Sequence, residues 1–135
     1  MSTKFEVAAQ QTIYTALNGN ISAEVFDDVP QLPNGKPHED FPYVVISEGD
    51  AYPFDSDNTL GATVYCTLHI WSRAKGMAEA KNLAGEIYEI LHRGRFTLAG
   101  YSLLDSLWES AVMRTYGDGE TRHGAIRYRL TIQEA

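Results

Sequence analysis

Cysteine is nearly absent from this chain of 135 residues, because Cys66 is the only one. A single cysteine cannot form an intramolecular disulfide, and it cannot supply a zinc cage made of thiolates. A reducing compartment is therefore the simplest expectation. Cys66 lies in an apolar strand pattern, which favours a buried, inert thiol over a nucleophile.

Long hydrophobic runs are also missing. The segment from Met1 to Glu6 has no apolar signal core, and no later run approaches the roughly 20 apolar residues that a membrane-spanning helix needs. The sequence therefore predicts a protein without a secretion signal and without a membrane partner.

Motifs that carry chemistry are equally scarce. The four histidines (His38, His69, His92, His123) share no metal-ligand spacing. The segment 55–59 begins like a calcium loop, but the glycine required at the sixth position is missing. Gly117 and Gly119 stand between two strand patterns, where a turn explains them better than a phosphate cradle does. We therefore expect no enzyme, no cofactor and no bound metal.

Basic residues are the smaller charge class, with 11 lysines and arginines against 18 acids and a net charge of -7. The acids gather between Glu24 and Asp57, where Lys36 is the one base. The last third is richer in arginine, with Arg122, Arg127 and Arg129. Such a chain will not hold a DNA backbone strongly over its whole surface. The acidic region is either a solvated loop or one half of a contact that pairs acidic and basic ends around a ring.

What is present is an ordinary globular composition, 44% hydrophobic and 21% charged, at a length that predicts one domain over residues 1–135. Apolar periodicity predicts helices over about 3–18 and from Lys75 to before Gly94, with Ser72 as a cap at the entry to the second. Strand patterns fall at 23–26, 42–47, 61–72, 103–115 and 122–133. This order, α-β-β-β-α-β-β, predicts an α+β fold: a mostly antiparallel sheet of about five strands with two helices packed on one face.

The strand over 61–72 alternates cleanly. One face carries the apolar set Val64, Cys66, Leu68 and Ile70, and the other carries Tyr65, His69 and Trp71. If the aromatic face lies opposite the helices, it is too apolar to be left wholly to water and predicts a partner or neighbouring subunits. The other possible register would place these aromatic residues inside.

Four segments, in this order, make the chain recognisable: Val25-Phe26-Asp27-Asp28-Val29-Pro30, then Phe41-Pro42-Tyr43-Val44-Val45-Ile46, then residues 69–84 (HIWSRAKGMAEAKNLA), then Asp118-Gly119-Glu120-Thr121-Arg122-His123-Gly124. Together they resemble the tail-completion proteins of long-tailed bacteriophages. That family includes head-to-tail joining proteins, is akin to tail terminators and has counterparts in gene transfer agents. Each segment alone is only a strand or a turn, so the ordered set carries the resemblance.

The resemblance implies a structural virion protein that forms a hexameric ring at the head-proximal end of the tail. The ring would end tail-tube polymerisation, join the tail to the head, or do both. Its partners would be further copies of itself, the tail-tube protein and a head connector or stopper protein. DNA would pass through the lumen without specific binding. The protein would belong to the virion tail, and to the bacterial host cytoplasm during assembly.

We expect the contacts on two regions. Residues 50–60 form a mobile loop or the tip of a long hairpin, whose aromatic residues either pack back on the domain or insert into a neighbour. The candidate interface residues are Tyr52, Phe54, Asp55, Asp57, Tyr65, His69, Trp71, Arg122, Arg127 and Arg129. Two alternatives remain at this point: a small enzyme or metabolite-binding module with its site on the aromatic strand face, and a nucleic-acid binder that uses the arginines.

Overall fold

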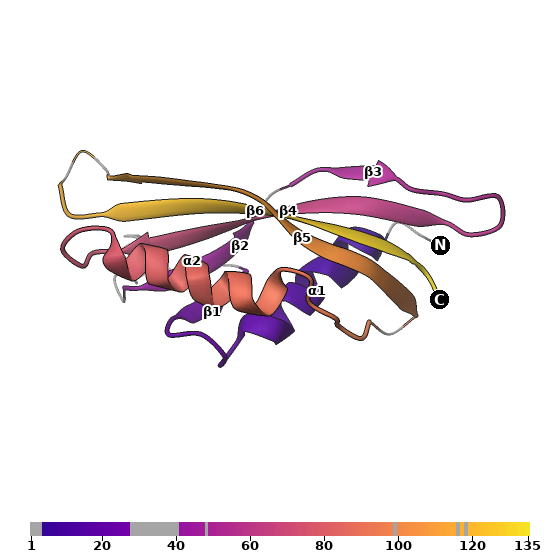
Figure 1. Ribbon diagram of the computed structural model, residues 1–135, viewed down its shortest axis with the longest axis horizontal. Coiled ribbons are helices and arrows are strands. Elements are labelled where there is room, and N and C mark those ends of the chain that lie inside the picture. The colour runs from indigo at the N-terminus through magenta and orange to yellow at the C-terminus, as the bar shows by residue number, and fades with distance from the viewer. Residues whose placement is uncertain (1–3, 28–40, 48, 99, 116, 118) are drawn as a thin grey trace, which may run out of the picture.

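The computed structural model describes residues 4–27, 41–47, 49–98, 100–115, 117 and 119–135. These residues form two helices and six strands (Figure 1). In chain order they are α1 (Phe5–Leu17), β1 (Glu24–Phe26), β2 (Tyr43–Ser47), β3 (Ala51–Pro53), β4 (Gly61–Ser72), α2 (Ala78–Leu91), β5 (Tyr101–Thr115) and β6 (Arg122–Glu134).

The six strands form one sheet in the order β1-β2-β4-β6-β5, and β3 adds to β4. All pairings are antiparallel except that of β1 with β2. β4 and β6 pair along their whole length, from Gly61 opposite Gln133 to Ser72 opposite Arg122. The α+β class and the mostly antiparallel sheet are confirmed, with six strands in place of about five because residues 51–53 add a short one.

Both helices pack on the same face of the sheet (Figure 1). Each helix buries four apolar side chains against it, spaced three or four residues apart: Phe5, Ala9, Ile13 and Leu17 from α1, and Ala80, Leu83, Ile87 and Leu91 from α2. They meet the apolar face of β4 and the alternate residues of β6. The predicted apolar stripe of the second helix is therefore core, with Ala80, Leu83, Ile87 and Leu91 at its centre.

The structure changes two local predictions. The second helix begins at Ala78 rather than near Lys75, and its N-cap position is Met77, which makes no side-chain capping bond. Ser72 therefore does not cap it. This serine is fully buried at the end of β4, where its hydroxyl donates to Glu79 Oε1 at 2.6 Å and accepts from the Ala74 amide at 3.2 Å. It braces the connection between strand and helix instead.

The aromatic residues of β4 lie on the face away from the helices, as the first of the two registers predicted. Val64, Cys66, Leu68 and Ile70 are buried in the core, whereas Tyr65, His69 and Trp71 are half-buried. We call this side of the sheet the open face. The β3–β4 hairpin and the β5–β6 hairpin extend to opposite ends of the molecule (Figure 1).

Candidate partner interfaces

The segment 50–60 is the tip of a long hairpin, one of the two structures that the sequence allowed. β3 pairs with the start of β4, and the Phe54 amide donates to the Gly61 carbonyl at 2.9 Å. The Gly61 amide in turn donates to Asp55 Oδ1 at 2.9 Å. A Cβ at Gly61 would lie 2.6 Å from the Phe54 carbonyl oxygen, so only glycine fits this close approach.

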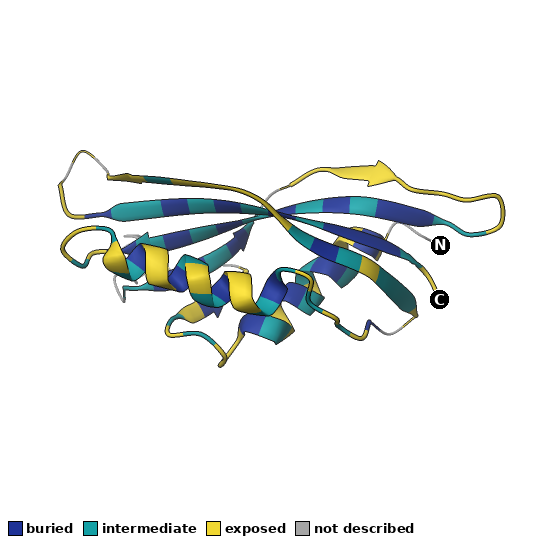
Figure 2. Cartoon of the chain, in the orientation of Figure 1, coloured by how far each residue is buried: buried dark blue, intermediate teal, exposed yellow. Residues whose placement is uncertain are grey.

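The tip presents aromatic and acidic side chains together. Tyr52 is 54% exposed and Phe54 49% exposed, and Asp55 and Asp57 are exposed beside them. All of β3 is exposed (Figure 2). Tyr52 makes an edge contact with Tyr65 at 5.9 Å between ring centroids, yet half of its surface stays accessible. We call residues 52–57 the acidic tip.

The open face brings three predicted residues into contact next to this tip. The Arg127 guanidinium lies 4.2 Å from the centroid of the Tyr65 ring, and it also forms an ion pair with Asp50 at 3.6 Å. Tyr65 thus links Tyr52 on one side to Arg127 on the other. Cation–π contacts of this kind hold an arginine side chain along the sheet rather than projecting it into solvent.

Farther along the open face, two histidines and a tryptophan form a second cluster. His69 Nδ1 lies 2.7 Å from His123 Nε2, and the Trp71 and His123 rings stack at 4.3 Å. Burial lowers the pKa of His123 below its ordinary value, and the neighbouring His69 and Arg114 lower it further. The spacing of the histidines along the chain gave no sign of this pair, which exists because β4 and β6 are neighbours in the sheet.

The other two predicted arginines also make contacts within the chain. Arg129 pairs with Glu109 on β5 at 3.7 Å. Arg122 donates to the Gly119 carbonyl at 3.0 Å, at the end of the β5–β6 hairpin. The acidic tip and Arg122 therefore lie at opposite ends of the molecule, and the structure does not bring them together within one chain (Figure 1).

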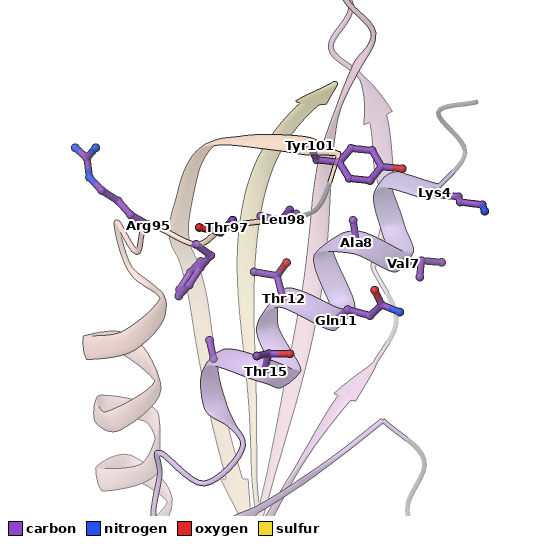
Figure 3. Close-up of a pocket in the computed structure, with 12 residues that line it drawn as sticks. Lys4, Val7, Ala8, Gln11, Thr12, Thr15, Arg95, Thr97, Leu98 and Tyr101 are labelled. Carbon is purple, nitrogen blue, oxygen red and sulfur yellow. The ribbon is translucent and has the colours of Figure 1, made fainter. Parts of the chain in front are cut away.

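Sequence reasoning missed the surface along α1. A groove of about 750 Å³ runs between this helix and residues 95–98 and Tyr101 (Figure 3). Ala8, Ala16, Phe96, Leu98 and Tyr101 make its apolar walls. Its charged lining residues are Lys4 and Arg95, which lie at its two ends, and the lining contains no acid (Figure 3). We call it the first groove.

A second groove, of about 480 Å³, lies on the other side of the same helix against β1. Val7, Gln11 and Thr15 line both grooves. The charged residue in the second lining is Asp27, whose carboxylate accepts a hydrogen bond from Gln10 Nε2 at 3.2 Å. The sequence did contain a signal for this surface, because Glu6 is the only charged residue within the thirteen of α1.

An aromatic cluster at the free edge of the sheet was missed as well. Tyr88 of α2 and His92, which directly follows the helix, stack at 4.6 Å, and the Trp108 amide of β5 donates to His92 Nδ1 at 3.1 Å. Trp108 is 44% exposed. β5 is an edge strand, and Leu104 and Val112 are exposed on it too. A long apolar edge strand is a surface that favours pairing with another chain.

The described residues do not gather the ligands that metal binding needs. Within them, no three His, Cys, Asp or Glu residues come close enough to hold a metal ion. Burial raises the pKa of the Cys66 thiol to about 11, with a smaller contribution from Glu6, so the thiol stays protonated near neutral pH. None of the described helices is long and apolar enough to cross a membrane.

The molecule is a two-layer α+β module with aromatic and apolar surfaces on its open face, its hairpin tip and its first helix, and such surfaces favour contacts with other proteins. Comparison with known proteins agrees. The family model "Tail completion protein gp17" matches residues 7–133, and the chain belongs to this family. It is 29% identical over 109 residues to the tail completion protein gp17 of Bacillus phage SPP1, covering 81% of this chain and 79% of that protein.

The fold is shared with a solved virion component. A chain in the structure of a native gene transfer agent particle superposes with a TM-score of 0.84 at 21% identity, covering 98% of this chain and 99% of that one. The family resemblance drawn from the sequence is confirmed. The protein is a structural tail completion protein of a phage-type virion and not an enzyme, so a catalytic site on the aromatic strand face is not supported.

Proposed function

We propose that the chain forms a ring, of six copies, at the head-proximal end of the tail, where it ends polymerisation of the tail tube. The observation that carries this proposal is family membership over nearly the whole chain. The surfaces described above support it, because a closed ring needs two different complementary patches on each subunit. The chain offers several patches, on the acidic tip, on α1 and on the open face.

The same ring would have the head connector or stopper protein on one side and the tail-tube protein on the other. We assign the open-face residues Tyr65, His69 and Trp71, with Arg127 and Arg129 beside them, to contacts with such neighbours. The net charge of -7 also suits a channel, since an acidic lumen repels phosphates and lets DNA pass without being held.

The mass of the protein in solution tests whether it forms a ring of six copies. Light scattering is measured on the purified chain alone and after mixing with tail-tube protein, since the ring can require the tube end as a template. A six-subunit mass in either sample supports the proposal. Monomer in both would overturn it.

Electron microscopy of particles from a deletion mutant separates the two roles. Overlong tails would show that the protein terminates the tube, which is the outcome we expect. Tails of normal length beside filled, tailless heads would instead show that it joins the tail to the head. Particles with normal, attached tails would contradict both roles.

A further inference from the structure

The first groove along α1 is open in the isolated chain, and so is the acidic tip. The groove has about 750 Å³ of space between α1 and the segment ending at Tyr101. On the tip, Tyr52 and Phe54 are each about half exposed, although both are large aromatic side chains. Within one subunit the acidic tip does not occupy the first groove. Each surface has the composition of a protein contact rather than of a solvated face.

The acidic tip and the first groove have complementary shapes. The groove has apolar walls from Ala8, Leu98 and Tyr101, and its volume lies in the range of pockets that bury several side chains. The tip is narrow, because the Phe54–Gly61 hydrogen bond closes it, and it projects its aromatic residues from the end of a hairpin. Aromatic anchors that enter an apolar groove are the residues that usually carry the binding energy of an interface.

Charge distinguishes this groove from its neighbour. The first groove carries Lys4 and Arg95 at its ends and no acid in its lining, whereas the tip carries Asp55 and Asp57. The second groove has Asp27 in its lining and would repel the same tip. Among the described residues, Arg127 and Arg129 pair with Asp50 and Glu109, whereas Lys4 and Arg95 stand at the ends of the first groove, where they can meet the tip's acids.

We propose that the acidic tip of one copy inserts into the first groove of the next copy, with Tyr52 and Phe54 against its apolar walls and Asp55 and Asp57 beside Lys4 and Arg95. This inference rests on the proposed ring and identifies the two surfaces that close it. The contact is heterologous, because tip and groove are different surfaces of the same chain, so it repeats from copy to copy as a ring requires.

Charge exchange tests the pairing on the full-length chain, under the condition in which the wild type assembles. Asp55→Asn with Asp57→Lys, or Lys4→Glu with Arg95→Glu, should each lower the assembled fraction at least about tenfold, because attractive pairs are lost or become repulsive. The asparagine oxygen can still accept the hydrogen bond from the Gly61 amide that closes the tip. The chain that carries all four substitutions should recover assembly. A 1:1 mixture of the two double variants should also assemble, with tips and grooves that match between unlike copies.

Cross-linking gives an independent measurement. Cys66 is buried with a raised pKa, so it contributes little background when cysteines are introduced elsewhere. Phe54→Cys with Thr12→Cys, where Thr12 lines the first groove, should give a covalent ladder of oligomers on mild oxidation. Phe54→Cys with Gln10→Cys is the matched control, since Gln10 lines the second groove and not the first, and it should stay monomeric under denaturing conditions.

The outcomes separate the inference from the function on which it rests. A wild type that assembles, together with charge variants that also assemble normally and no Thr12 ladder, would overturn the tip-in-groove contact and leave the ring standing. A ladder from the Gln10 pair instead would place the tip in the second groove and would likewise overturn it. A wild type that stays monomeric with tail-tube protein would overturn both. Loss of tube binding while the ring remains intact would show that the tip binds the tube.

Discussion

The two helices have similar inner faces, which pack on the sheet, and different outer faces. α1 and α2 each bury four apolar residues against the same side of the sheet. The outer face of α2 carries the exposed charges Lys81 and Glu89 beside the exposed Tyr88, and its half-buried Glu79 and Glu86 bond to serines of the same chain. By contrast, α1 has Glu6 as its single charge and leaves Val7 and Tyr14 exposed. Solvent and contacts within the chain account for the charges of α2. A partner accounts better for the outer face of α1, because uncharged and partly apolar helix faces flanked by grooves are suited to protein contacts.

The largest effect should come from placing a charge on the outer face of α1. Gln11 lines both grooves, and Gln11→Glu would place an acid in the first groove, where it repels the acidic tip. We expect this variant to fold normally but to lose assembly under conditions where the wild type assembles, measured by light scattering with tail-tube protein. Asn82→Glu on the exposed face of α2 is the matched control and should assemble. Equal behaviour of the two variants would remove the distinction between the helices.

Truncations on the inner faces of the two helices should lower the stability by similar amounts. Ile13 in α1 and Ile87 in α2 are both fully buried. Truncation of either to alanine leaves a cavity in the core, so Ile13→Ala and Ile87→Ala should each lower the free energy of unfolding by about 2–5 kcal/mol. Denaturant unfolding of both variants measures this. A cost well below 1 kcal/mol for Ile13→Ala alone would mean that α1 is held mainly by its partner rather than by the sheet.

A smaller effect is expected from the charges of α2, because some of them serve the fold. Glu86 accepts a hydrogen bond from the Ser22 amide at 2.7 Å and another from the Ser22 hydroxyl at 3.0 Å. Glu86→Ala should therefore cost about 1 kcal/mol of unfolding free energy. Glu89→Ala, at an exposed position three residues on, should stay within about 0.5 kcal/mol. Thermal or denaturant unfolding distinguishes them, and equal costs would contradict a structural role for Glu86.

The smallest effect concerns pH and the open face rather than the helices. The pKa of His123 is lowered in the folded state, so below the ordinary value of about 6.5 the unfolded chain binds this proton more readily. The stability that His123 contributes is fully present above about pH 6.5. It is lost as the pH falls from that value through the lower pKa of His123 in the folded state. His123→Gln should flatten that part of the stability-against-pH curve. An unchanged slope between pH 7 and pH 5 would show that His123 does not titrate differently on folding.

Most of the fold could be read from periodicity. Alternation in β4 placed Leu68 and Trp71 on opposite faces correctly, and the three-to-four spacing from Ala80 to Leu91 identified the core side of α2. These predictions succeed because a strand or helix fixes the direction of its side chains locally. Helix starts were less exact, since the turn before Ala78 depends on how Ser72 and Glu79 meet at the end of β4.

The candidate contacts could be predicted only in part. Aromatic and acidic residues at positions 52–57 were identified as a possible tip from the sequence, and the structure describes that tip. The partners of Arg127 and Arg129 could not be foreseen, because Asp50 and Glu109 reach them across the sheet from other strands. The histidine pair arose in the same way, from residues 54 positions apart that strand pairing made neighbours.

The sequence alone settles the class of this protein: an acidic α+β module with a single inert cysteine, whose ordered segments mark a tail completion family. Composition and local periodicity suffice for the fold class because they depend on neighbouring residues only, whereas the family follows from the resemblance of the four ordered segments. The tertiary structure decides the rest. The first groove exists because the segment after α2 returns to lie beside α1, which is about eighty residues earlier in the chain. The space between two such segments depends on how they pack, and the sequence of either segment alone does not determine it.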